Sequence, residues 1–572
     1  MKKRTALILA AGTAAVALGA AAVGAVALFV REGGRPAVAW PGSKGYLALD
    51  LEGELPEQQP GGLPGFFESR APSLRALVEA VNRSAADPQV KGLVLRVGPL
   101  DAGWGRVAEL RDALVRFRRS GKPSWAHLEL AGNREYYLAT GCSKIAAAPT
   151  ALLDITGLAA EVTFFRGTLD KVGVEAQFEG VGKYKNAPNQ YTETGFTEPH
   201  REQMESLVGD LFDAYVAAVA EGRGLAPEKV RALIDEGPFE SKRAAELGLI
   251  DELLYRDEVE SRMSGGNRLS PGRYVKSARG FGFDGRAKVA LIYAVGDIVS
   301  GESEPGPFGG EGAVGSDTLI QGLRQASDDD DVRAIVLRVD SPGGSGTASD
   351  AVWREIGRAR QRKPLVVSMG DYAASGGYYI AMNSDAIVAQ PGTITGSIGV
   401  FSGKFSLRGL YEKLGLSRGT VVRGRNARLF SSWEPWTEDE RAKIRGLNEA
   451  FYETFVKKAA EGRKKTPEEI DAVGQGRVWT GRQALAAGLV DMLGGLDQAV
   501  KVAREKAHIP AGEATRLIVL PERKGLFETL LQRQEEDIVS RALGRQGAAL
   551  IRWAAVAGEG PAARLPFELA VR

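Results

Sequence analysis

Residues 332–339 read VRAIVLRV, and residues 90–97 read VKGLVLRV, a near-copy 242 positions earlier in the chain. Each is a short run rich in valine, isoleucine and leucine, which is typical of a strand buried on both faces of a parallel sheet. The same separation relates YYLATGCSKIA at 136–146 to YYIAMNSDAIV at 378–388. Because both pairs of segments are separated by the same 242 positions, the sequence indicates a tandem duplication.

Each copy alternates strands with helices. In the second copy the buried strand precedes an amphipathic helix expected over residues 347–361, then a second buried strand over 365–369 and a further strand near 386–389. Strands alternating with helices at this spacing predict parallel sheets with crossover helices, and hence an α/β fold.

The duplication divides the chain into segments. Residues 258–287 are rich in glycine, serine and arginine without a period, which is typical of a linker. We therefore predict an N-terminal anchor over 1–31, a first repeat over 45–257, a linker over 258–287, a second repeat over 288–510, and a tail of unassigned role over 511–572.

Composition excludes several classes of function. Lys plus Arg number 74 and Asp plus Glu number 72, so the net charge is only +2. This excludes the excess of positive charge that nucleic-acid binding usually requires. The single cysteine, Cys142, excludes an internal disulfide framework and any multi-cysteine metal site. Three histidines are scattered without ligand-like spacing. We expect no metal and no cofactor, and a base other than histidine for any hydrolytic chemistry.

The N-terminus has the pattern of a membrane anchor. Lys2, Lys3 and Arg4 precede an uncharged stretch from Thr5 to Val30. As a helix this stretch would span roughly 39 Å, enough to cross a hydrocarbon core of about 30 Å. Cations before the helix favour a cytoplasmic N-terminus, with the bulk of the chain outside. A cleaved signal peptide and a buried core helix are the alternatives.

The two copies differ where a nucleophile could stand. The second copy has AASGGYY at 373–379, with Ser375 followed by Gly376, whereas the first copy has Asn133 at the position of Ser375. A serine between a buried strand and a helix start lies where backbone N–H groups point outward and negative charge is favoured. Ser375 is therefore the candidate nucleophile.

A second glycine pair is also missing from the first copy. The second copy reads DSPGGS at 340–345, and the aligned residues 98–103 read GPLDAG. Gly343 and Gly344 would let another backbone approach closely. Their N–H groups, with that of Gly376, are the candidate donors to an oxyanion.

The candidate base lies in the other copy. Residues 181–187 read VGKYKNA and the aligned residues 422–427 read VRGRNA, so that Arg425 stands opposite Lys185. A desolvated lysine can lose its proton, whereas an arginine cannot. A base near pH 7 needs a pKa lowered by roughly 3 units, on the order of 4 kcal/mol. Alignment on Asn-Ala favours Lys185, and Lys183 is the competing candidate.

Four segments together resemble the signatures of one family. DSPGGS at 340–345, AASGGYY at 373–379, TGSIGV at 395–400 and YKNA at 184–187 are similar to those of the signal peptide peptidase A family in its long, duplicated form. This resemblance covers roughly residues 45–510. It implies a tandem repeat of crotonase-like (Clp-protease-like) α/β units with an N-terminal transmembrane helix.

The resemblance also implies a function. It makes the chain a membrane-anchored serine endopeptidase with Ser375 as nucleophile and Lys185 as general base. Ser397 either orients the lysine or is only a turn residue. The implied substrates are hydrophobic peptides, above all signal peptides left after secretion. The implied setting is the inner membrane, with a homo-oligomer, by resemblance a tetramer, on its periplasmic face.

Two other functions share part of this pattern. A crotonase-type acyl-transfer enzyme would have the same fold and oxyanion hole without needing a serine–lysine pair. A non-catalytic envelope scaffold would need neither residue. Retention of both Ser375 and Lys185 favours the peptidase.

Overall fold

The computed structural model describes residues 44–58, 72–263, 266–277, 287–303, 312–522 and 562–564. The anchor predicted over residues 1–31 lies outside these ranges. Among the helices within them, none combines the length and the apolar character needed to span a bilayer.

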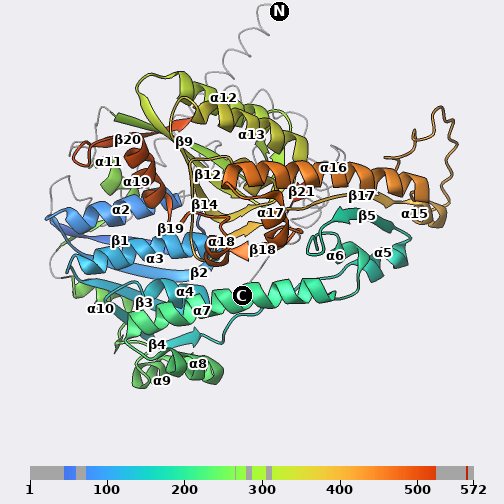
Figure 1. The fold of residues 1–572 in the computed structure, drawn as a ribbon. Helices are drawn as coiled ribbons and strands as arrows, with labels where there is room; N and C mark the ends of the chain where they lie inside the picture. The colour runs from blue at the N-terminus through green and yellow to red at the C-terminus, as the bar shows by residue number, and fades with distance from the viewer. Residues whose placement is uncertain are drawn as a thin grey trace, which may run out of the picture.

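The first unit is built on a seven-stranded sheet in the order β6-β4-β3-β2-β1-β8, with β7 paired to β4. The four long strands run parallel, and helices cover them (Figure 1). The elements of this unit are β1 (Gly45–Glu54), α2 (Leu74–Ala86), β2 (Val90–Asp101), α3 (Trp104–Arg119), β3 (Ser124–Gly132), α4 (Asn133–Ala139), β4 (Lys144–Asp154), α7 (Glu198–Arg223), α8 (Pro227–Glu236), β6 (Phe239–Glu240), α9 (Ser241–Glu246), β7 (Glu252–Leu253), α10 (Arg256–Ser261), β8 (Asn267–Leu269) and α11 (Pro271–Ser277).

The second unit repeats this plan on an eight-stranded sheet. Its main order is β18-β16-β14-β12-β9-β20, with β15 paired to β14 and β19 to β15. Its elements are β9 (Ala287–Val295), α12 (Ser316–Asp328), β12 (Val332–Ser341), α13 (Gly346–Arg360), β14 (Leu365–Ala374), α14 (Gly376–Ala381), β15 (Ala386–Ala389), β16 (Ile394–Gly396), α16 (Glu438–Arg463), α17 (Pro467–Val473), β18 (Val478–Thr480), α18 (Gly481–Ala486), β19 (Met492–Leu493), α19 (Leu496–Lys506) and β20 (Thr515–Leu520).

Parallel strands in both sheets and matching element orders confirm the α/β class and the duplication. Some elements lie outside the predicted repeats. β8 and α11 lie within the predicted linker 258–287, and β8 extends the first sheet by pairing with β1. β20 lies within the predicted tail and pairs with β9. Short strands that complete a sheet edge carry little periodic signal, so the sequence pattern misses them.

Local chemistry explains the elements around the site. In β12 every residue except Arg333 is buried, which suits the β-branched run VRAIVLRV to a strand covered on both faces. At α16, the Thr437 hydroxyl accepts a hydrogen bond from the N–H of Glu440. The Glu440 carboxylate in turn accepts one from the N–H of Thr437. This capping box fixes where the 26-residue helix begins.

A third sheet joins the two units, in the order β11-β10-β13-β21-β17-β5. Its first-unit strand β5 pairs antiparallel with second-unit β17, with Val181 opposite Val400. Both strands lie on the right of Figure 1, below α16. The remaining bounds are α5 (Arg166–Val172), β5 (Glu175–Val181), α6 (Asn189–Thr192), β10 (Ile298–Val299), β11 (Val314–Gly315), β13 (Gly343–Ser345), β17 (Val400–Ser406), α15 (Arg408–Lys413) and β21 (Ala562–Arg564).

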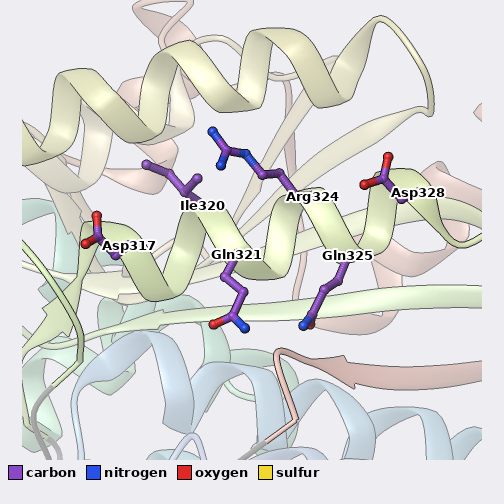
Figure 2. A pocket seen from close by; sticks show the side chains of 6 residues that line it. All are labelled: Asp317, Ile320, Gln321, Arg324, Gln325 and Asp328. Carbon is purple, nitrogen blue, oxygen red and sulfur yellow. The ribbon is translucent and has the colours of Figure 1, made fainter.

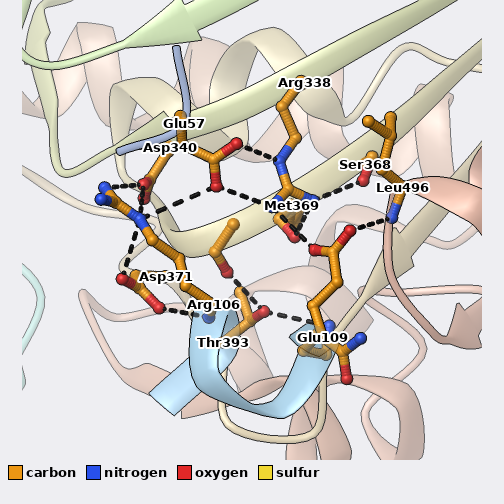
Figure 3. A network of polar contacts seen from close by, with 12 residues as sticks. Glu57, Arg106, Glu109, Arg338, Asp340, Ser368, Met369, Asp371, Thr393 and Leu496 are labelled. Carbon is orange, nitrogen blue, oxygen red and sulfur yellow. Dashed lines mark hydrogen bonds and ion pairs between the residues drawn. The ribbon is translucent and has the colours of Figure 1, made fainter. Parts of the chain in front are cut away.

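A buried ion network also crosses between the units (Figure 3). The Arg338 side chain, on β12, is fully buried. Its guanidinium donates to both carboxylate oxygens of Glu57 at 2.9 and 2.7 Å and to Glu109 at 2.8 Å, both first-unit residues. It also donates to the Ser368 hydroxyl at 2.8 Å and to the Met369 carbonyl at 3.2 Å. These contacts use the whole guanidinium fork, so the buried charge is fully paired.

We expect Arg338→Ala to lower the free energy of unfolding by about 3–5 kcal/mol, because it takes the counter-ion from the buried Glu109 carboxylate and leaves Glu57 to the Arg106 guanidinium 3.7 Å away. The matched control is Arg96→Ala. Arg96 occupies the same position in the first repeat but is partly exposed and lies 3.5 Å from Glu52, so its loss should change stability by less than about 1 kcal/mol. Urea unfolding followed by circular dichroism measures both. Equal losses in the two variants would contradict the role assigned to the network.

Candidate active site

Ser375 and Lys185, which the sequence places 190 residues apart, are in contact. The Nζ atom of Lys185 lies 2.8 Å from Oγ of Ser375. It also lies 2.9 Å from Oγ and 3.1 Å from the carbonyl oxygen of Ser397. Ser375 and Ser397 are fully buried and Lys185 is 6% exposed. Three polar groups from both units thus meet in one desolvated site.

Ser375 stands at a sharp turn between β14 and α14. Its φ of 55° and ψ of −112° lie outside the ordinary regions for a residue with a side chain. The turn is held by a hydrogen bond from the Ser375 N–H to the Gly396 carbonyl at 2.8 Å. A Cβ at Gly377 would lie 2.6 Å from the Ser341 carbonyl oxygen, so this position needs glycine. The strained backbone presents the serine hydroxyl to the lysine.

Lys185 is brought in by the loop after β5. The N–H of Tyr184 donates to the Gln475 carbonyl at 2.8 Å, which ties this first-unit loop to the second unit. A Cβ at Gly476 would lie 2.6 Å from the Lys185 backbone nitrogen, and Gly476 has a φ of +74°. Only glycine permits this close approach. The glycines of GQG at 474–476 are the sequence feature that permits this contact, and the repeat comparison does not reveal it.

Burial lowers the pKa of Lys185 well below its ordinary value near 10.5, and no neighbouring carboxylate opposes this effect. The neutral form of Lys185 is therefore more accessible than that of an exposed lysine.

The other candidate positions differ from these two. Lys183 is exposed, with its Nζ 4.6 Å from the centre of the Tyr184 ring, so it lies away from Ser375. Arg425, the counterpart of Lys185, is also exposed. Asn133, the counterpart of Ser375, donates from its amide to the Gly157 carbonyl at 2.8 Å. The serine–lysine contact is therefore formed by Ser375 and Lys185, and the aligned positions Asn133 and Arg425 form no second pair of this kind.

The glycines proposed as oxyanion donors lie beside this site. Gly343 and Gly344 form the start of β13, with φ values of 109° and 156°. Gly376 is the first residue of α14, whose first-turn N–H groups have no acceptor within the helix. The N–H of Gly343 donates to the Ser341 hydroxyl at 3.2 Å. Gly344 is paired in the third sheet with Ile298 of β10.

A charge cluster that the sequence analysis missed supports both glycine segments (Figure 3). Asp340, just before SPGG, accepts from Nε of Arg106 at 2.9 Å and from the Tyr372 N–H at 2.8 Å. Asp371, four residues before Ser375, accepts from the Arg106 N–H at 2.7 Å and lies 3.1 Å from its Nε. Burial raises the pKa of Asp371 to about 6 although Arg106 lowers it. One first-unit arginine therefore holds both second-unit segments.

No other described feature competes with this site. A cavity of about 410 Å³ lies along α12 (Figure 2), lined by Asp317, Ile320, Gln321, Arg324, Gln325 and Asp328. All six belong to one helix, and none was a candidate site residue. Among the residues that the structure describes, no group of three or more histidine, cysteine, aspartate or glutamate side chains could hold a metal ion.

The family model of peptidase family S49 matches residues 116–270 and again residues 358–510. The chain belongs to peptidase family S49. It is a serine peptidase with a duplicated S49 domain, as the sequence predicts. It is 35% identical over 489 residues to the chloroplastic serine protease SPPA of Arabidopsis thaliana, covering 83% of this chain and 71% of the relative. It is 34% identical over 456 residues to Protease 4 of Salmonella typhi, covering 76% and 72%.

Among solved structures, the S49 chain is similar to ClpP1 from Listeria monocytogenes. The identity is 14%, the TM-score is 0.22, and the match covers 36% of this chain and 94% of the other.

The lowered pKa of Lys185 predicts a pH-dependent stability. Between that pKa and about 10.4, the unfolded chain binds a proton that the folded chain does not, so stability rises with pH by up to about 1.4 kcal/mol per unit. The free energy of unfolding of the wild type minus that of Lys185→Met should therefore increase from pH 7 to pH 9. Lys183→Met, at an exposed lysine two residues away, is the matched control. Urea unfolding at several pH values checks this, and a flat line for Lys185→Met would refute the shift.

Proposed function

We propose that the S49 chain cleaves peptide bonds with Ser375 as nucleophile and Lys185 as general base. The contact of 2.8 Å between Nζ and Oγ carries this proposal. Neutral Lys185 takes the proton of the Ser375 hydroxyl as Oγ attacks the peptide carbonyl carbon. The ammonium then gives that proton to the leaving amine, and water hydrolyses the acyl-enzyme with Lys185 again as base.

The neighbours of Nζ support Ser397 as the positioning residue of Lys185 in its neutral form. A neutral amine has two N–H groups and one lone pair, and Nζ has three polar neighbours. With both N–H groups donating to the hydroxyl and carbonyl oxygens of Ser397, the lone pair is directed to the Ser375 hydroxyl. This is the arrangement that proton abstraction requires.

We assign the tetrahedral oxyanion to backbone N–H groups of Gly344 and Gly376, with Gly343 shaping the strand. Removing one such donor typically costs about 3–4 kcal/mol of barrier. The hydrogen bonds of Asp340 and Asp371 to Arg106 support this assignment, because they hold the two donor segments at fixed spacing.

The alternative functions fit the site less well. An acyl-transfer enzyme of the crotonase type needs no buried lysine against a serine, and desolvating a lysine is costly unless its basicity is used. A scaffold needs neither the strained Ser375 backbone nor the buried amine. The geometry therefore favours hydrolysis through an acyl-enzyme.

We propose hydrophobic peptides, including signal peptides left after secretion, as the substrates. This follows from the resemblance to signal peptide peptidase A and from the proposed anchor over residues 1–31. That anchor would hold the peptidase on the periplasmic face of the inner membrane, where such peptides remain after export. We also propose the division of the chain predicted from the sequence: an anchor over 1–31, repeats over 45–257 and 288–510, a linker over 258–287 and a tail over 511–572.

We expect Ser375→Ala and Lys185→Ala each to lower hydrolysis of an apolar fluorogenic peptide by at least about a thousandfold, because each removes one half of the dyad. Lys183→Ala is the matched control and should keep near wild-type kcat/KM. The full chain in detergent micelles is the sample, with folding checked by circular dichroism. Full activity of Lys185→Ala would overturn the dyad.

We also propose that the chain forms a closed homo-oligomer, with a tetramer as the expected size. Inside one chain, β5 of the first unit pairs with β17 of the second. The counterpart of β5 in the second unit, residues 417–422, forms no strand among the described elements, and neither do residues 158–164, the counterpart of β17. Large apolar side chains are exposed on and around residues 417–422: Leu414, Leu416, Val421 and Phe430.

These two segments, neither of which forms a strand among the described elements, would complement each other. If residues 417–422 of one copy add to residues 158–164 of the next, the pairing inside each chain is repeated between chains. Such a head-to-tail contact is heterologous and closes into a ring when the rotation permits. It would also cover the exposed apolar side chains.

We expect the double variant Leu416→Asp and Val421→Asp to shift the full chain in detergent toward the monomer, because charges would replace apolar contacts at the interface. Leu447→Asp, an exposed leucine on α16, is the control and should leave the mass unchanged. Light scattering after size-exclusion chromatography measures the mass. A monomeric wild type, or an unchanged mass in the double variant, would refute the interface.

A further inference from the structure

Arg477 lies where the two units meet, one residue after the Gly476 that closely approaches Lys185. Its Nη1 atom donates to Oε1 of Glu202, on α7 of the first unit, at 2.8 Å and to the Tyr184 hydroxyl at 3.1 Å. The Tyr184 hydroxyl itself donates to the Glu202 carboxylate at 2.8 Å. One second-unit side chain is therefore joined to two first-unit side chains, and one of these belongs to the residue just before Lys185.

Ring contacts add to these hydrogen bonds. The Arg477 guanidinium lies over the Tyr184 ring, 4.8 Å from its centre, and over the Trp479 ring, 4.5 Å from its centre. Tyr184 is only 5% exposed, and a cation on an aromatic face is held more strongly where water is excluded. A planar guanidinium both stacks and pairs, which an ammonium cannot do. We call Glu202, Tyr184 and Arg477 the latch.

The main chain of Arg477 joins the latch to the proposed active site. The Arg477 carbonyl accepts a hydrogen bond from the Ser397 N–H at 2.7 Å. The Ser397 hydroxyl in turn accepts one from the Lys185 amine at 2.9 Å, and Lys185 directly follows Tyr184 in the chain. Arg477 therefore contacts both the turn that holds Ser397 and the loop that delivers Lys185.

We propose that Arg477 is a positioning residue for the base, which acts through the latch to hold Lys185 against Ser397 and away from water. This inference rests on the proposed function for the role of Lys185, but not for the contacts of Arg477. Burial lowers the pKa of Lys185. Loosening the latch should admit water, raise that pKa toward its ordinary value and leave less neutral base at a given pH.

Arg477→Gln in the full chain in detergent tests the proposal, with folding checked by circular dichroism. We expect kcat for the apolar fluorogenic peptide to fall at least about tenfold with little change in KM, because a displaced base slows the chemical step more than binding. The acid limb of kcat against pH should move to higher pH by at least about half a unit. Arg477→Lys keeps the charge but not the planar stack, so it should recover only part of kcat.

Arg482→Gln is the matched control. Arg482 also joins the second unit to α7, through Nε and Nη2, which donate to Oδ1 of Asp210 at 2.9 and 2.7 Å, further along the helix than Glu202. Its loss removes an ion pair of the same kind between the units, but it should leave kcat and the pH profile unchanged. Equal effects of Arg477→Gln and Arg482→Gln would overturn the inference, because the latch would then serve stability alone.

Glu202→Ala separates positioning from a direct effect of charge. It loosens the latch but leaves the positive charge of Arg477 without its carboxylate, and that charge by itself would lower the lysine pKa. Positioning predicts an acid limb moved to higher pH, as in Arg477→Gln. A limb moved to lower pH would overturn the inference.

Failure of the proposed dyad and failure of the latch give different results. If the dyad is wrong, Lys185→Ala stays active. If only the latch is wrong, Lys185→Ala is inactive while Arg477→Gln has the kcat and the pH profile of the wild type.

Discussion

The antiparallel pairing of β5 with β17 is the interaction that makes one site from two units. Its register sets Val181 opposite Val400, so that the chain leaving β5 delivers Lys185 to the segment that leads into β17. The close approach of Gly476 to the Lys185 backbone and the burial of the Lys185 side chain keep this residue largely out of solvent. Burial without a carboxylate partner lowers the lysine pKa, which is the property that the proposed role of Lys185 as base requires.

Two buried basic side chains, Arg338 and Lys185, have opposite electrostatic surroundings. Arg338 is fully buried but is paired with Glu57 and Glu109, so it stays charged and joins the two units. Lys185 is almost as deeply buried but meets only hydroxyl and carbonyl oxygens. Desolvation disfavours the charged form of both side chains. The carboxylates of Glu57 and Glu109 compensate this at Arg338, whereas at Lys185 no carboxylate does so and the pKa falls.

Each unit carries only one of the two residues of the proposed dyad. The amide of Asn133, at the serine position of the first unit, is committed to a backbone carbonyl. Arg425, at the lysine position of the second unit, is exposed and cannot act as a base. The proposed nucleophile therefore comes only from the second unit and the proposed base only from the first. The β5–β17 pairing joins these units, so both are needed to form the proposed dyad.

The sequence by itself determined the duplication and the α/β class, and it singled out Ser375 and Lys185, whose side chains are in contact, as the proposed dyad. Strand periodicity and the chemistry of aligned residues are local properties, and two copies in one chain supply their own comparison. Only the tertiary structure decided the contacts of Ser397, the clamp of Arg106 on Asp340 and Asp371, and the pairing of the C-terminal strand with β13. Each depends on which segments, hundreds of residues apart, the sheet register brings within hydrogen-bonding distance, and register between distant strands leaves no periodic trace in the sequence.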